Sequence, residues 1–248
     1  MTTKYTTRKI AVFALLIFCP LIGMAAANIN LGPIHFDKET VSPALQAFAL
    51  LTVLSLAPSI LIMLSSFTRI VVVLSMLRTA LGLQQTPPNT VLISLSLFLT
   101  LFTMMPVAKS IYAEAYQPYE AQLISTETAL NRAATPLKQF MLKQTREKDM
   151  QVILQLAKEP MPASAAEIKF YQLVPAFLLS ELQTAFQIGF MIFLPFLLVD
   201  LIVSGILMTM GMMMMPPMSI SLPVKILLFV LIDGWDLLVQ ALVGSFHN

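Results

Sequence analysis

Charged side chains inside long apolar stretches are the residues of this sequence best placed to do chemistry. Four of them are Arg69, Glu181, Asp200 and Lys225. A charge at the centre of a bilayer costs ~2.5–3.5 kcal/mol on insertion scales, so such a group normally faces protein or water. The carboxylates could relay protons or cations, as in secondary transporters, or they could pair with the two bases within or between subunits. Three acids, counting Asp233, against two bases and without a histidine nearby favour pairing.

Enzymatic chemistry has little support in the same sequence. The two histidines, His35 and His247, stand near opposite ends of the chain, which argues against a metal cluster or a Ser–His–Asp arrangement. The single cysteine, Cys19, lies in an N-terminal apolar run. Asp233 and Asp236 lack the motif of an intramembrane aspartyl protease, and no phosphate-binding glycine-rich loop occurs. The sequence therefore predicts no catalytic residue, no metal site and no cofactor.

A run of methionines between two apolar stretches is the other candidate site. Seven of the 17 methionines fall within residues 208–218, which we call the methionine segment. Methionine is unbranched, flexible and polarizable, so a cluster of it can re-pack around different shapes. The segment is predicted to be a deformable apolar seal. The alternative is an apolar loop that joins two membrane helices.

The composition places the chain among membrane proteins. Hydrophobic residues make up 57% of it, charged residues only 11%, and the mean hydropathy is +0.81. The net charge is +2, but without the basic side chains of the first nine residues, 12 basic and 13 acidic side chains remain. No basic patch is left to attract nucleic acid.

The N-terminal residues 1–27 have the pattern of a secretory signal peptide. Lys4, Arg8 and Lys9 form its basic start, an apolar run follows, and Ala25–Ala27 supplies the small residues of a cleavage site. The sequence predicts cleavage after Ala27. The alternative is that these residues form an uncleaved first membrane helix.

Four hydrophobic segments follow, two within residues 44–108 and two within 170–248. They cover residues 44–83, 91–108, 170–210 and 221–246. Each suffices for a membrane-spanning helix of ~20 residues, and the first and third would each give ~60 Å of helix, twice the ~30 Å of a hydrocarbon core. Several prolines lie in or beside them. We therefore expect four long, proline-broken helical segments that pack mainly against other protein, especially other subunits.

Residues 109–169 form a different kind of sequence, with eight basic and seven acidic side chains. Apolar residues recur at helical spacing over residues 137–157, which predicts an amphipathic helical hairpin bounded by Pro136 and Pro160. A cleaved signal leaves residues 28–43 outside the cytoplasm. Two crossings then place the hairpin domain on the same outer side, and the methionine segment lies on the cytoplasmic side.

Several long motifs of the chain resemble the FliP family of flagellar type III secretion export-gate proteins and their injectisome counterparts, the SctR family. The motifs occur in order and cover nearly the whole chain after the signal peptide. They lie at residues 66–74, 77–82, 85–89, 175–190, 194–200, 210–217, 221–225 and 233–235.

The resemblance implies an all-α integral membrane protein in a helical oligomeric pore. It implies a homo-oligomer, a pentamer in the family, that assembles with FliQ and FliR and works with FlhB and FlhA. Unfolded flagellar proteins would pass through this pore across the bacterial inner membrane at the flagellar basal body. Carried over to this sequence, the residues that seal the pore would be Met210, Met212, Met213, Met214 and Met215. An autonomous small-solute or proton-coupled transporter is the alternative function.

Overall fold

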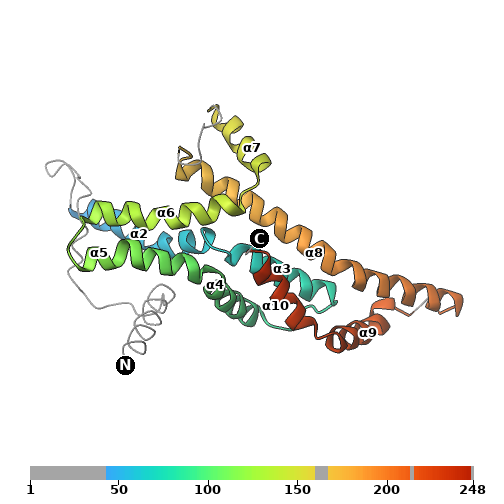
Figure 1. Ribbon diagram of the computed structural model, residues 1–248. Helices are drawn as coiled ribbons and strands as arrows, with labels where there is room; N and C mark the ends of the chain where they lie inside the picture. Colours follow the sequence, from blue (N-terminus) through green and yellow to red (C-terminus); the bar gives the residue numbers. More distant parts are fainter. Residues whose placement is uncertain (1–42, 160–166, 213–214, 247–248) are drawn as a thin grey trace, which may run out of the picture. The chain divides into compact units, whose positions relative to one another are not determined.

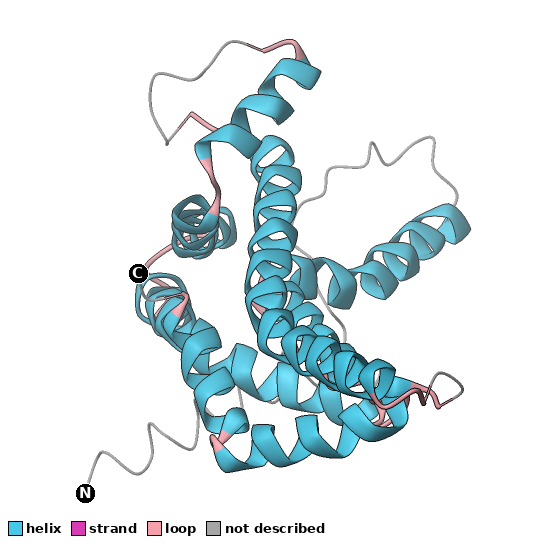
Figure 2. Ribbon diagram, turned by 90° about the vertical axis from the view of Figure 1, so that its right-hand side faces the viewer, coloured by secondary structure: helices cyan, strands magenta, loops and turns pink. Residues whose placement is uncertain are grey.

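The computed structural model describes residues 43–159, 167–212 and 215–246, and within these residues all regular structure is helical (Figures 1 and 2). This confirms the predicted all-α class. The elements are α2 (Pro43–Met63), α3 (Phe67–Ala80), α4 (Asn89–Ile111), the π-helix η1 (Tyr112–Tyr116), α5 (Gln117–Glu120), α6 (Thr126–Gln144), α7 (Glu147–Ala157), α8 (Phe170–Thr209), α9 (Pro217–Leu231) and α10 (Gly234–Gly244). The predicted signal peptide and its alternative fall outside the described residues.

The chain divides into two compact units, residues 1–61 and 62–248. In the first unit the structure describes most of α2. This helix is mostly apolar, with no distinct polar face, and the side chains of Phe48, Leu51 and Leu54 are exposed. A helix that is hydrophobic on all sides is typical of a membrane span or a buried helix.

The first predicted hydrophobic segment, residues 44–83, is not one continuous helix. It breaks between α2 and α3, where the hydroxyl of Ser65 donates to the carbonyl of Ile62 at 2.8 Å and accepts from the N–H of Phe67 at 3.3 Å. Serine hydroxyls that bond to nearby backbone groups compete with helical hydrogen bonds. The first segment is therefore broken, as expected, but the break lies at residues 64–66 and not at a proline, since Pro58 lies inside α2.

The third segment, by contrast, is a single helix. α8 runs for 40 residues, about 60 Å, and continues through Pro175 and Pro195 (Figure 1). Pro106 and Pro223 likewise lie inside α4 and α9. The expectation of proline-broken helices is wrong at these positions. Each proline removes one backbone hydrogen bond, and the contacts of α8 with α3, α6, α7 and α9 support the helix around the missing bonds.

Two glycines end helices of the second unit in the left-handed conformation. Gly82 has φ +78°, and the N–H of Leu83 donates to the carbonyl of Arg78 at 3.1 Å, which closes a Schellman motif after α3. α8 ends in the same way at Gly211, with φ +72° and a bond from Met212 N–H to the carbonyl of Leu207 at 3.0 Å. The methionine segment therefore overlaps a well-defined helix end.

The second unit has two hydrophobic clusters. The first joins α3, α4, α8, α9 and α10 and includes the buried Leu74, Ala185 and Leu242. The second joins α6, α7 and the first turns of α8 and includes the buried Met141 and Phe177. Both clusters use α8, which therefore serves as the common support of the unit.

Two of the described helical stretches are long and apolar enough to cross a membrane. They are Asn89–Glu120, which comprises α4, η1 and α5, and Phe170–Thr209, which is α8. α9 and α10 qualify as a third only if the pair, bent by 66°, is counted as one span. The four predicted segments are thus seen in part, as two such stretches or three with the bent pair.

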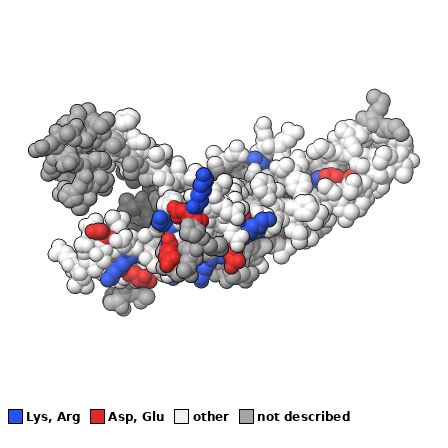
Figure 3. All heavy atoms as spheres, turned by 90° about the horizontal axis from the view of Figure 1, so that it is seen from above, with Lys and Arg blue, Asp and Glu red and all other residues white. Residues whose placement is uncertain are grey.

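The charged part of the sequence contains the predicted amphipathic helices. α6 buries Phe140 and Met141, α7 buries Met150 and Leu154, and both helices pack against α8. Pro136, predicted at the edge of this region, lies inside α6. Figure 3 shows charged side chains of both signs close together on one part of the second unit, whereas the rest of that face is almost uncharged.

Candidate functional site

The first ion pair joins α3 to α8 and is fully buried. The side chains of Arg69 and Glu181 are 2% and 0% exposed. Arg69 Nε donates to Glu181 Oε2 at 2.9 Å, and Arg69 Nη2 donates to Glu181 Oε1. The guanidinium thus binds the carboxylate through a bidentate pair of hydrogen bonds, which is a strong arrangement that also fixes the orientation of both groups.

The remaining donors of Arg69 also have partners. Its Nη2 donates to Gln144 Oε1 at 2.9 Å, and its Nη1 donates to the carbonyl and the hydroxyl of Ser245 at 3.2 and 3.0 Å. The ring of Phe246 lies 3.9 Å from Arg69 Cζ. A buried charge is tolerated only when it is paired and hydrogen-bonded, and this one is bonded by residues from three other parts of the chain.

The second ion pair joins α8 to α9. Lys225 Nζ donates to Asp200 Oδ2 at 2.6 Å and to the carbonyl of Ala80, at the end of α3, at 3.2 Å. The side chain of Lys225 is 5% exposed and that of Asp200 is 40% exposed. Within the part of the chain that the structure describes, Asp200 Oδ1 is buried and has no hydrogen-bond partner.

The structure therefore brings the four candidate charges together as two separate pairs, Arg69 with Glu181 and Asp200 with Lys225. Glu181 and Asp200 lie 19 residues apart on one continuous helix, about 28 Å along its axis. Asp233 is exposed at the break between α9 and α10. Carboxylates so far apart do not form the continuous relay that a proton-coupled transporter needs.

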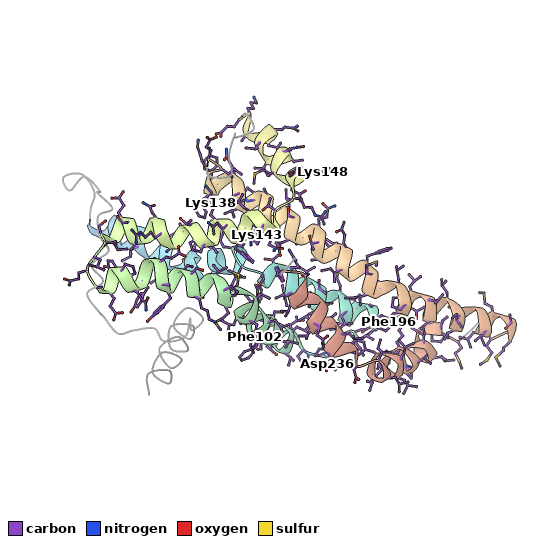
Figure 4. All side chains as sticks on the ribbon, viewed as in Figure 1. Phe102, Lys138, Lys143, Lys148, Phe196 and Asp236 are labelled. Carbon is purple, nitrogen blue, oxygen red and sulfur yellow. The ribbon has the colours of Figure 1, made fainter. Side chains whose placement is uncertain are left out.

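The methionine segment lies at the far end of α8 and the start of α9. Met210, Met212 and Met215 are 67%, 37% and 41% exposed, and the flanking Met208 and Met218 are also exposed. Figure 4 shows sulfur atoms projecting from these helix ends. The predicted seal residues Met213 and Met214 lie outside the described residues. A group of exposed thioethers at one helix end can supply a soft apolar contact surface.

A polar stripe on α8 adds to Gln187 two residues, Ser180 and Thr184, that the sequence did not single out. Ser180 donates to Asp149 Oδ2 at 2.5 Å and accepts from the backbone N–H of Arg146 at 3.0 Å. Arg146 Nη2 donates to Gln187 Oε1 at 2.6 Å and to Thr184 Oγ1 at 3.3 Å. The spacing of residues 180, 184 and 187 places them on one helix face, so helical periodicity of the polar residues was the available signal.

Metal binding has no support among the residues that the structure describes. They contain no cluster of three or more His, Cys, Asp or Glu side chains that could hold a metal ion. A shallow depression along α4 is lined by Thr90, Val91, Ser94, Leu95 and Phe98, none of which is charged.

Comparison with known proteins gives a consistent result. Residues 50–242 match the FliP family. The chain is 53% identical to a flagellar biosynthetic protein FliP of Bacillus subtilis over 210 residues, 85% of this chain and 95% of the relative. It is 46% identical over 243 residues to that of Pectobacterium carotovorum, covering 98% and 94%. It is 50% identical over 227 residues to that of Caulobacter vibrioides, covering 92% and 84%.

Proposed function

The chain belongs to the FliP family, and on that premise we propose that it is a pore-forming core subunit of the flagellar type III protein export gate. Family membership and the apolar helices make it a membrane-embedded flagellar protein with a role in export rather than an enzyme. The finer proposal depends on one observation: a long helix with an exposed apolar surface ends in a group of exposed methionines.

The surface of α8 supports the proposal of an oligomer. Phe186, Phe190 and Leu201 are among the many large apolar side chains that it exposes, at 58%, 61% and 62%. A hydrocarbon core of ~30 Å can cover only about half of this helix, so protein must cover much of the rest. We propose that further copies of the chain, five in total, together with FliQ and FliR cover it, and that FlhB and FlhA complete the gate. The four predicted hydrophobic segments then pack within the assembly.

The methionine segment would form the seal of this pore. A channel for unfolded flagellar subunits must accept any side chain and yet hold back ions and water when idle. The thioethers of Met210 and Met212–Met215 can pack against one another and re-pack around a moving chain, which branched side chains do less well. A narrow hydrophobic constriction also excludes water by dewetting.

The remaining parts of the proposal concern location. We propose that residues 1–27 are a cleaved signal peptide, that 28–43 and 109–169 lie in the periplasm, and that the complex sits in the inner membrane at the flagellar basal body. The mixed charge of α6 and α7 suits a domain outside the hydrocarbon. We propose that the driving energy comes from other components of the gate.

Conductance of the purified complex in lipid bilayers tests the seal. Replacing Met210 and Met212–Met215 by alanine removes apolar volume at the constriction and leaves the buried ion pairs untouched. We expect an intact complex on native gels, a clear rise in conductance of the idle gate, and export that is only partly reduced. Met191→Ala, compared once its complex is shown to be intact on native gels, is the control, because Met191 is 68% exposed on α8 but lies outside the methionine segment. An intact multiple variant with wild-type conductance would rule out the seal.

A further inference from the structure

Phe246, two residues before the end of the chain, packs against both hydrophobic clusters of the second unit. Its ring stacks on that of Phe140 of α6, with 6.4 Å between the ring centroids and 25° between the planes. The same ring lies over the guanidinium of Arg69 of α3. An aromatic face over a desolvated cation gives a stronger attraction than at an exposed site.

Polar contacts hold the same short segment. Arg69 Nη1 donates to the carbonyl and hydroxyl of Ser245, and Gln144 Nε2 donates to the carbonyl of Phe246 at 3.3 Å. Gln144 at the end of α6 also accepts from Arg69 through Oε1. One amide side chain thus bridges the guanidinium and the C-terminal backbone, and both of its polar groups are used.

These contacts give α9 and α10 a second attachment to α3. The first is Lys225 of α9, whose Nζ donates to the carbonyl of Ala80 at the end of α3. The second is the Ser245–Phe246 contact with Arg69, near the start of α3. The two points on α3 are separated by 11 residues, about 16 Å of helix. α9 and α10 are bent by 66° relative to each other. Because the pair is attached to α3 at both Lys225 and Ser245–Phe246, its movement away from α3 is restrained.

We propose that Ser245 and Phe246 form a C-terminal strap, a set of positioning residues that ties the end of α10 to Arg69 and couples α6 to the bent pair α9–α10. Movement of α10 away from α3 would uncover a buried guanidinium, which is strongly disfavoured. α9 begins within the methionine segment. The strap therefore links α6, through α10 and α9, to that segment. The proposal rests on these contacts and stands independently of the export function.

Hydrogen exchange of the full-length protein, purified in detergent in its assembled state, tests the strap. Phe246→Leu keeps the apolar character and removes the aromatic face, whereas Phe246→Tyr keeps both. We expect the amides of α10 to exchange roughly tenfold faster in Phe246→Leu and within about twofold of wild type in Phe246→Tyr. Phe102→Leu is the matched control, because Phe102 is exposed on α4 (Figure 4) and its replacement should leave α10 unchanged.

A second variant tests the coupling. Gln144→Ala keeps the aromatic ring and the ion pair but removes the bridge from α6, and we expect the amides of α10 to exchange several-fold faster. Two results would overturn the strap: unchanged α10 exchange in Phe246→Leu, or equal acceleration in Phe246→Leu and Phe246→Tyr. Unchanged α10 exchange in Gln144→Ala would overturn the coupling to α6. None of these readouts depends on export, so failure here leaves the proposed function standing.

Discussion

The two ion pairs on α8 differ in how completely the chain satisfies them. Arg69 and Glu181 are buried, and groups of α6 and of the C-terminal residues accept hydrogen bonds from the remaining N–H groups of the guanidinium. In the other pair Lys225 is buried, but Asp200 is 40% exposed and its Oδ1 has no partner among the described residues. The first pair is thus complete within one chain, and the second is not.

The difference follows from the chemistry of the two cations. Arginine presents five donors in a rigid planar fork, so one residue can bond several helices at once. Lysine is a compact point charge on a flexible stem, and here it reaches one carboxylate and the carbonyl of Ala80. An arginine at such a junction can therefore bond more groups at once than a lysine, which here bonds one acceptor on α8 and one at the end of α3.

The largest effect is expected when the complete pair is broken. Glu181→Ala leaves the guanidinium of Arg69 buried without its counter-charge, and such losses cost about 3–5 kcal/mol. We expect the free energy of unfolding in detergent to fall by that amount and the yield of assembled complex to fall with it. Glu120→Ala, which removes an exposed acid, is the control. Equal stability of the two variants would contradict this view of the site.

A smaller loss is expected at the incomplete pair. In Asp200→Ala, Lys225 keeps its bond to the carbonyl of Ala80, and the lost carboxylate was partly solvated, so we expect about 1–3 kcal/mol. The double variant Asp200→Ala with Lys225→Met should recover part of this loss in a double-mutant cycle on unfolding. If Asp200→Ala proved as damaging as Glu181→Ala, exposure would not be what distinguishes the two pairs.

The smallest effect is expected from one of the redundant contacts of Arg69. Ser245→Ala removes the hydroxyl acceptor, but Arg69 Nη1 keeps the carbonyl of the same residue. A hydrogen bond of this kind contributes about 0.5–1.5 kcal/mol, and we expect a loss near the lower limit in the same unfolding measurement. A loss comparable to that of Glu181→Ala would make Ser245, rather than the carboxylate, the principal partner of Arg69.

The sequence was most informative where residues stand out against their surroundings. Charges such as Arg69 and Glu181 are conspicuous in apolar stretches, and the resemblance identified the family over most of the chain. The break at Ser65 was not predicted, because hydrophobicity continues across it and the local sign of it is the bonding of a single serine hydroxyl to nearby backbone groups. Pro175 and Pro195 indicated breaks that tertiary contacts override.

The partners of Arg69 could not be found from the sequence for a different reason. Gln144 and Ser245 lie 75 and 176 residues away in the chain, and neither residue type is unusual. Only the packing of α6, α8 and α10 around α3 brings them together. Local patterns carry information about individual helices, whereas the set of side chains around a buried charge depends on how the helices meet.

The end of α8 at Gly211 has an electrostatic consequence for the methionine segment. A helix carries roughly half a negative charge at its C-terminus and roughly half a positive charge at its N-terminus, from its aligned peptide dipoles. α8 ends at Thr209 and α9 begins at Pro217, so opposite helix poles flank the same short stretch. The two poles contribute electrostatic potentials of opposite sign there, which offset each other. A charged side chain of either sign that comes near this stretch is therefore neither held nor repelled by the backbone, which suits a surface that meets many different sequences.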